Sequence, residues 1–283
     1  MKIIDRDDIF FPKKLLSVEP IIKRIYVEGN EKILNDFGIA VVGSRNSSNE
    51  GEKLTNEFVE KLVEYDINII SGLAIGIDSR AHRSCLSNGG KTIAVIGSGF
   101  NNIYPKRNRY LYEQIIRSGG AVVSEYPPDT EVDSSYFPER NRIVSGLSDG
   151  VLVIEGKHRS GTTITARMAV NQGKPVFCVP RSVYNSYGTG PNYLIQHGGI
   201  LVTGYMDIID YYKSQKIYLK QKEKDKLLYD NEILKLLSNE ILNKEELALR
   251  TKKSIKEINQ IITILELEGL ISGEEGKGYK VIW

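Results

Sequence analysis

The sequence predicts an α/β protein, in which a mostly parallel sheet covered by helices on both faces is followed by a small winged-helix domain. Short apolar runs rich in β-branched residues alternate with helical periods from residue 39 to residue 179, as in a parallel sheet. Three of these runs end in Gly/Ser turns, which are typical of ligand-binding strand ends. The composition changes near residue 211, where lysines become frequent and short amphipathic helices follow.

Residues 1–36 contain Pro12 and Pro20 and show little regular period. An apolar stretch at 21–27 and a short helix-like piece at 31–36 are their recognisable features. We expect these residues to form a lead-in that packs on the main sheet.

The main domain is expected at residues 37–212. Its strands are predicted at residues 39–42, 67–70, 92–96, 121–124, 151–154 and 175–179. Its helices are predicted at residues 52–65, 77–86, 109–117, 139–147 and 162–171. Since parallel strands end at one edge of the sheet, the loops that follow them should converge on a shared rim.

Residues 137–165 carry the strongest sign of a binding site. Two arginines flank an asparagine at 140–142, a short strand follows, and Ser160 and Gly161 stand at the start of a predicted helix. Helix N-termini attract anions, and arginine forks match phosphate oxygens. Arg45 adds a cation after another strand, so the pattern predicts a phosphate-binding surface.

Other kinds of ligand are not indicated. No turn reads G-x-G-x-x-G, no acidic residue ends the second strand and no Walker loop is present, so we expect no cofactor. His158 and His197 have no metal-ligand spacing with each other or with cysteine, so we expect no metal. The formal net charge is +2, so a basic surface must be local.

Cys85 and Cys178 lie far apart in mostly apolar or small-residue surroundings, as buried cytosolic thiols do. No signal peptide or membrane-length apolar run is visible, so we expect a cytoplasmic protein without membrane association.

The C-terminal part predicts a Lys-rich linker at residues 213–228 and a winged-helix domain at residues 229–283. Helices are predicted at 230–238, 244–249 and 254–268, before a hairpin that pairs 270–271 with 279–282.

The third of these helices begins with Ser254 and Glu257, which fit a capping box. It carries Glu257, Glu266 and Glu268 beside Lys256, whereas a major-groove reader would carry more arginine. Protein docking or dimer support is therefore favoured for this domain, with DNA contact left open.

The sequence resembles the DNA-processing protein A family, DprA/Smf, in seven motifs that occur in a fixed order. They are VVGSR (41–45), SGLAIGIDSRAH (71–82), TIAVIGSG (92–99), SEYP (124–127), FPERNRIVSGLS (137–148), LVIE (152–155) and SGTTITA (160–166). The resemblance spans roughly residues 10–205, and the tail after about residue 231 resembles the winged-helix domain that many members carry.

This resemblance implies an extended Rossmann-like domain that binds single-stranded DNA in a basic pocket and forms a homodimer. It also implies a protein that shields incoming DNA and hands it to RecA in natural transformation, and that is not an enzyme. The DNA-binding candidates carried over by motif are Gly43, Ser44, Arg45, Arg140, Asn141, Arg142, Ser160, Gly161 and Thr162.

The chain departs from the family pattern in three places. Its lead-in is too short for the sterile-alpha-motif-like domain found first in many members. Glu139 stands where another basic residue is common, and Arg181 stands where glycine is frequent. The two substitutions could weaken or redirect DNA contact.

Several candidate residues have more than one possible role. Arg140 and Arg142 cannot face the same way on a helix, so we expect one to contact DNA and the other an internal carboxylate. Asp78 and His82 share a helix face and are expected to form a structural pair that fixes the 72–76 turn.

Aromatic and basic residues near the strand ends could extend the site. Each of Tyr104, Tyr126, Tyr136 and Phe137 could stack on bases or pack in the core. Lys157 and Arg159 could add to the basic face or belong to an exposed loop.

Two alternatives to DNA binding remain at this point. A nucleotide-binding enzyme such as a nucleoside-monophosphate phosphoribohydrolase would need a positioned carboxylate, for which Glu155 is the candidate, although the expected double-glycine turn is missing. A pure adaptor would grip its partner through the winged helix and use the main domain as a scaffold.

Overall fold

The structure is a computed structural model, and it describes residues 1–217, 219, 232–267, 270–274 and 276–282. The chain divides into two compact units, Met1–Leu219 and Lys220–Trp283. Most of the predicted Lys-rich linker, including Lys220, Lys222, Lys224 and Lys226, lies outside the described residues, as do Asp230 and Glu268.

The described main unit contains a nine-stranded sheet in the order β1-β2-β6-β5-β4-β3-β7-β8-β9. The strands are β1 (Lys2–Asp5), β2 (Arg24–Gly29), β3 (Gly38–Gly43), β4 (Asn68–Ser71), β5 (Thr92–Ile96), β6 (Ala121–Ser124), β7 (Gly150–Glu155), β8 (Val176–Cys178) and β9 (Ile200–Leu201). β2 pairs antiparallel with both β1 and β6, and all other neighbours in this sheet pair in parallel.

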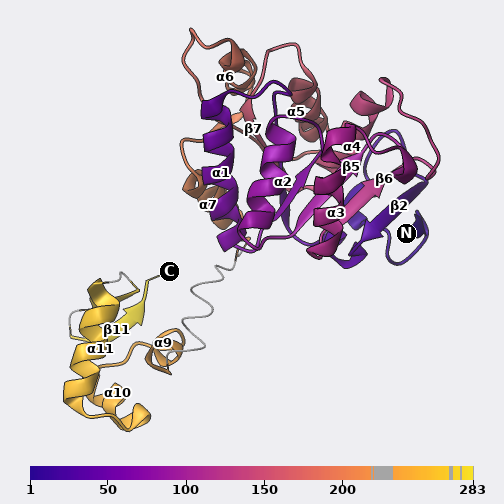
Figure 1. The fold of residues 1–283 in the computed structure, drawn as a ribbon. Coiled ribbons are helices and arrows are strands. Elements are labelled where there is room, and N and C mark those ends of the chain that lie inside the picture. Colours follow the sequence, from indigo (N-terminus) through magenta and orange to yellow (C-terminus); the bar gives the residue numbers. More distant parts are fainter. Residues whose placement is uncertain (218, 220–231, 268–269, 275, 283) are drawn as a thin grey trace. The chain divides into compact units, whose positions relative to one another are not determined.

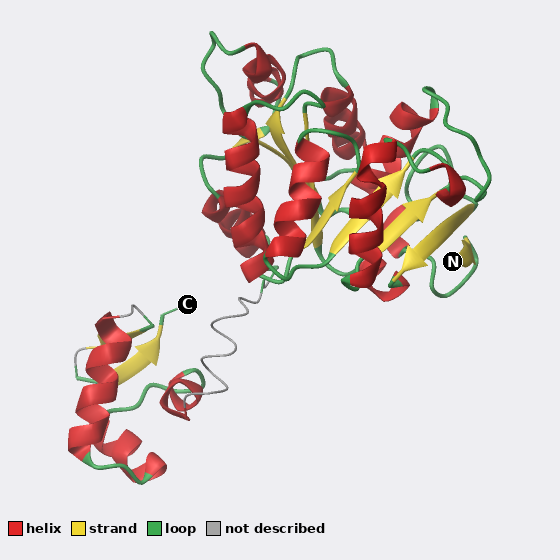
Figure 2. Ribbon diagram, in the orientation of Figure 1, coloured by secondary structure: helices red, strands yellow, loops and turns green. Residues whose placement is uncertain are grey.

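Helices cover both faces of this sheet (Figures 1 and 2). α1 (Asn49–Glu64), α2 (Ile77–Ser87), α3 (Arg109–Arg117) and α7 (Tyr205–Ser214) pack on one face through two apolar clusters. α4 (Tyr136–Leu147), α5 (Gly161–Asn171), α6 (Thr189–Gln196) and the lead-in pack on the other. The strands from β3 to β8 are buried on both sides, which explains their apolar sequences. The predicted fold class is confirmed.

Several elements were not predicted. The lead-in supplies the antiparallel strands β1 and β2, and α6, β9 and α7 follow β8. β9 has two residues, and α6 starts with Gly190 and Pro191 in its first turn, so neither leaves a readable period. The helix-like piece after β2 is a 3-10 helix, Glu31–Asn35.

The second unit has the expected three helices and hairpin. They are α9 (Glu232–Leu237), α10 (Lys244–Thr251), α11 (Ile255–Leu267), β10 (Ile271–Glu274) and the antiparallel β11 (Gly278–Val281). The predicted capping box is present, because the Ser254 N–H donates to Glu257 Oε2 (2.8 Å) and the Glu257 N–H donates to Ser254 Oγ (3.3 Å). Glu257 is therefore engaged in closing the helix start.

His82 on α2 is fully buried and does not make the expected pair with Asp78. Thr92 Oγ1 donates its single proton to the Ile69 carbonyl (2.6 Å), so the proton between His82 Nδ1 and Thr92 Oγ1 (2.7 Å) comes from the imidazole. Within the described residues, His82 Nε2 is buried without a hydrogen-bond partner. Burial lowers the pKa of His82 to about 3.

This buried imidazole should make the main unit sensitive to acid. The unfolded chain binds a proton at His82 near pH 6.5 and the folded chain near pH 3, so stability falls as the pH drops through this window. The expected loss between about pH 7.5 and about pH 5 is roughly 2 kcal/mol. Urea unfolding followed by circular dichroism measures it, and His82→Gln should flatten this dependence. An equal pH dependence in both proteins would contradict the assignment.

Candidate functional site

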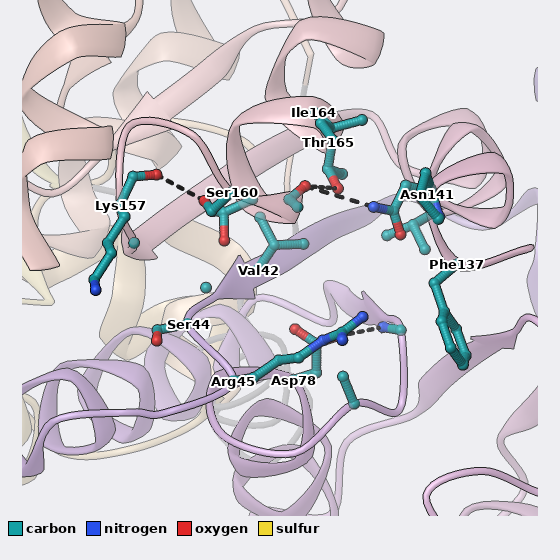
Figure 3. Close-up of a pocket in the computed structure, with 18 of the residues that line it drawn as sticks. Val42, Ser44, Arg45, Asp78, Phe137, Asn141, Lys157, Ser160, Ile164 and Thr165 are labelled. Atoms are coloured by element: carbon teal, nitrogen blue, oxygen red, sulfur yellow. Dashed lines mark hydrogen bonds between the residues drawn. The ribbon is translucent and has the colours of Figure 1, made fainter. Parts of the chain in front are cut away.

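A pocket of about 690 Å³ opens at the carboxyl ends of β3, β4 and β7, where the starts of α2, α4 and α5 meet (Figure 3). Eight of the nine predicted site residues line it, namely Gly43, Ser44, Arg45, Arg140, Asn141, Ser160, Gly161 and Thr162. Arg142 is not among the lining residues. Segments more than a hundred residues apart in sequence thus form one surface.

The loop after β3 is held against the start of α2. A Cβ at Gly43 would lie 2.5 Å from Ile77, and one at Gly76 (φ +79°) would lie 2.2 Å from the Ser44 carbonyl oxygen. The Ile77 N–H donates to that same carbonyl (3.1 Å). Glycine is therefore required at both positions for the close approach that fixes the loop.

This loop presents Arg45 to solvent at the pocket (Figure 3). The guanidinium carbon lies 5.4 Å from the centre of the Phe137 ring, which is cation–π distance. Within the described residues, Arg45 forms no ion pair with a carboxylate. Its charge therefore stays available to an anion in the pocket.

Arg140 lies at the pocket floor and is 4% exposed. Its Nη1 donates to the carbonyls of Gly72 and Val95, at the ends of β4 and β5, and its Nε donates to Asn141 Oδ1 (3.2 Å). Burial lowers the pKa of Arg140 to about 10, while nearby Asp78 acts in the opposite direction. Arg140 therefore ties α4 to two strand ends.

Asp78 shares this floor and accepts the Gly72 N–H (3.2 Å). A Cβ at Gly72 would lie 2.7 Å from both Arg140 Nη2 and Asp78 Oδ2, so the turn needs glycine there. Burial raises the pKa of Asp78, with Arg140 opposing the shift. Asp78 thus fixes the 72–76 turn without help from His82.

Arg142 points away from the pocket and forms the internal ion pair. Its Nη2 donates to both carboxylate oxygens of Glu125 (2.8 and 2.7 Å). Of the two arginines in this motif, Arg142 therefore satisfies the carboxylate and Arg140 reaches the pocket.

The first turn of α5 forms another wall. Ser160 Oγ donates to the Lys157 carbonyl (2.7 Å), and the Ser160 N–H donates to Thr163 Oγ1 (3.3 Å). The N–H groups of Gly161 and Thr162 lie in the first turn, where an α-helix supplies no acceptor and its dipole is positive. Asn141 Nδ2 reaches the Gly161 carbonyl at 3.5 Å and links this wall to α4.

Exposed cations and aromatic rings complete the rim. Lys157 and Arg159 follow β7, are exposed and line the pocket with Arg45. The rings of Tyr104 and Phe137 lie 5.5 Å apart on the opposite wall. The site thus combines positive charge with aromatic faces, as nucleic-acid sites do.

Some neighbouring residues lie outside the pocket lining. Tyr126 and Tyr136 stack on each other, with ring centres 4.2 Å apart, and do not line the pocket. The Tyr126 hydroxyl donates to Glu139 (3.1 Å), so this acidic residue also lies outside the lining.

The site residues assigned by resemblance to the family motifs do not include Lys157, Arg159 or Tyr187, all of which line the pocket. Two cations directly after a strand and before a helix were a usable signal for the first two. Tyr187 follows β8, and its hydroxyl accepts from Asn46 Nδ2 (3.0 Å) across the pocket mouth. A hydrogen bond between two loops that are distant in sequence leaves no periodic pattern from which it could be predicted.

Glu155, the carboxylate considered for an enzyme, is fully buried outside the pocket lining. It accepts from the Ser48 N–H (2.8 Å) and Ser48 Oγ (2.6 Å) at the start of α1, and from Arg181 Nη2 (3.2 Å). Arg181 also pairs with Glu50 (2.6 Å), so it is an internal residue.

Across the described ranges, no group of three or more His, Cys, Asp or Glu side chains is arranged to hold a metal ion. In the same residues, no helix has the length and apolar character needed to cross a membrane.

The Arg142–Glu125 pair should contribute to stability. Arg142→Ala leaves a largely buried carboxylate without its cation, so we expect a loss of about 1–3 kcal/mol in the free energy of unfolding. Arg117→Ala removes an exposed pair with Glu113 and should change it by less than about 0.5 kcal/mol. Urea titration compares the two, and equal losses would count against the role of Arg142.

Comparison with known proteins identifies the family. The model of the DNA recombination-mediator protein A family matches residues 2–213, and that of the DprA winged helix domain matches residues 229–277. Protein Smf of Escherichia coli is 37% identical over 98% of this chain and 76% of its own length. DNA processing protein DprA of Streptococcus pneumoniae is 41% identical over 71% of each chain.

Two solved structures agree. DprA from Streptococcus pneumoniae superposes with a TM-score of 0.70 and 40% identity, covering 74% of this chain and 73% of its own. DNA processing protein A from Helicobacter pylori, described for its single-stranded DNA binding mode, superposes with a TM-score of 0.67 and 26% identity, covering 76% of this chain and 97% of its own. The chain therefore belongs to the DNA recombination-mediator protein A family.

Proposed function

We propose that this protein binds single-stranded DNA in the pocket at the carboxyl ends of β3, β4 and β7. The observation that carries the proposal is the arrangement of exposed Arg45, Lys157 and Arg159 around one opening, together with the first turn of α5. Membership of the family and the DNA binding described for the Helicobacter pylori relative support it.

The DNA-binding residues in this proposal are the eight that line the pocket, extended by Lys157 and Arg159. Arg45, Lys157 and the α5 N–H groups would hold phosphates, and Arg140 would keep the floor in place. The faces of Tyr104 and Phe137 suit bases that are unstacked. A base pair within a duplex hides its faces, so this arrangement favours an unpaired strand.

We also propose that the bound strand is protected and passed to RecA by a homodimer during natural transformation. The description of the family as recombination mediators supports the transfer step. The protein would act without catalysis, since the carboxylate considered for nucleotide hydrolysis, Glu155, is held between Ser48 and Arg181.

Binding should depend on salt in proportion to the phosphates neutralised. Arg45→Ala and Lys157→Ala should each weaken binding to an unstructured oligonucleotide and reduce the slope of log K against log salt by about 0.7. Lys23→Ala, which removes an exposed lysine outside the pocket, serves as control and should leave both unchanged. Fluorescence anisotropy at several salt concentrations measures this. Equal affinity for duplex and single strand, or no salt slope, would exclude the proposal.

The transfer step has its own test. The protein should accelerate RecA filament assembly on an oligonucleotide, and Arg45→Ala should lose this effect in parallel with its DNA affinity. Light scattering during assembly measures the rate. Strand binding without any acceleration would leave DNA binding intact and remove RecA loading from the function.

A further inference from the structure

The loop between β8 and α6 carries two large side chains that the described residues of the main unit leave exposed. Val183 is 82% exposed and Tyr184 is 96% exposed. The loop projects from the main unit beside α6 (Figure 1). A tyrosine ring left almost entirely in water has both faces free to contact a ligand.

Both ends of the loop are anchored in the main unit, and the anchor at its C-terminal end belongs to the pocket lining. At its start, the buried side chain of Arg181 pairs with Glu155 and Glu50. At its end, the Tyr187 hydroxyl accepts from Asn46, and the Tyr187 carbonyl accepts the Gly156 N–H (2.7 Å). The loop therefore stands in a fixed place beside the pocket mouth.

The tip between these anchors is a hydrogen-bonded turn. The Asn185 N–H donates to the Ser182 carbonyl (3.0 Å), and the Tyr184 N–H donates to Ser182 Oγ (3.3 Å). Asn185 Oδ1 accepts the Tyr187 N–H (2.9 Å). Tyr184 is thus presented by an ordered turn, which lowers the entropy lost when a ligand stacks on it.

The loop itself carries no negative charge that would repel a polyanion. Residues 182–189 contain no acidic or basic side chain and offer hydroxyl and amide donors. The exposed cations Lys157 and Arg159 follow β7, next to the loop's contact at Gly156. A phosphate backbone that passes over residues 182–189 therefore meets no like charge from the loop itself.

We propose that Tyr184 is a second base-stacking platform, which takes a base of the strand just outside the pocket. This inference rests on the proposed single-strand binding and extends it to a strand segment held between two aromatic positions. Tyr104 and Phe137 stand at one wall, next to Arg45. Tyr187 lines the pocket through its contact with Asn46, and Tyr184 lies shortly before Tyr187 on the same loop. An aromatic ring accepts any unpaired base and excludes a duplex, whose bases are already stacked.

The test compares strand lengths. Tyr184→Ala should weaken binding of a long oligothymidylate by about five- to tenfold, and should hardly affect a strand of about four nucleotides, which fills the pocket alone. Tyr184→Phe keeps the ring and should bind as the parent does. Phe10→Ala removes another exposed ring, in the lead-in, and should have no effect.

A second arm separates stacking from other contacts. When abasic residues replace the thymidines outside the pocket, the parent and Tyr184→Ala should bind equally. If the parent binds long strands and Tyr184→Ala binds them equally well, the platform is wrong while the proposed function stands. If the parent binds no single strand, the proposed function fails and the platform with it.

Discussion

The buried guanidinium of Arg140 is the contact on which the rest of the pocket depends. It donates to carbonyls at the ends of β4 and β5 from a position on α4, so it joins two strand ends to the helix that carries Asn141. Buried carbonyls without donors are costly, and a buried arginine without acceptors is costlier. Each group satisfies the other, and Gly72 leaves the space they need. The cation that shapes the floor is thus distinct from the cations that face the opening.

This division of labour explains how a chain with a formal charge of +2 offers a basic site. Arg140, Arg142 and Arg181 are all buried and hold parts of the fold together, and Arg140 also lines the pocket floor. Arg45, Lys157 and Arg159 are exposed at strand ends and serve the pocket. The parallel sheet brings them together, because the ends of β3 and β7 are adjacent in it.

Sequence reasoning reached the fold class and much of the pocket because both follow from local patterns. Buried strands have apolar runs, and Gly/Ser turns after them mark the ligand edge. The roles of Arg140 and Arg142 could not be assigned, since each depends on a partner, Gly72 or Glu125, that is distant in sequence. The partner of His82 was predicted wrongly for the same reason: helix spacing suggested Asp78, whereas the adjacent strand supplied Thr92.

The network at Arg181 has a consequence for the speed of recognition. Its guanidinium fastens the loop that carries Tyr187 to Glu155 and, through Glu50, to α1. Swinging that loop open would strand a fully buried carboxylate without its cation, a large penalty. The mouth of the pocket is therefore built before any ligand arrives, so encounter should be governed by diffusion and long-range attraction instead of by a slow rearrangement of the protein.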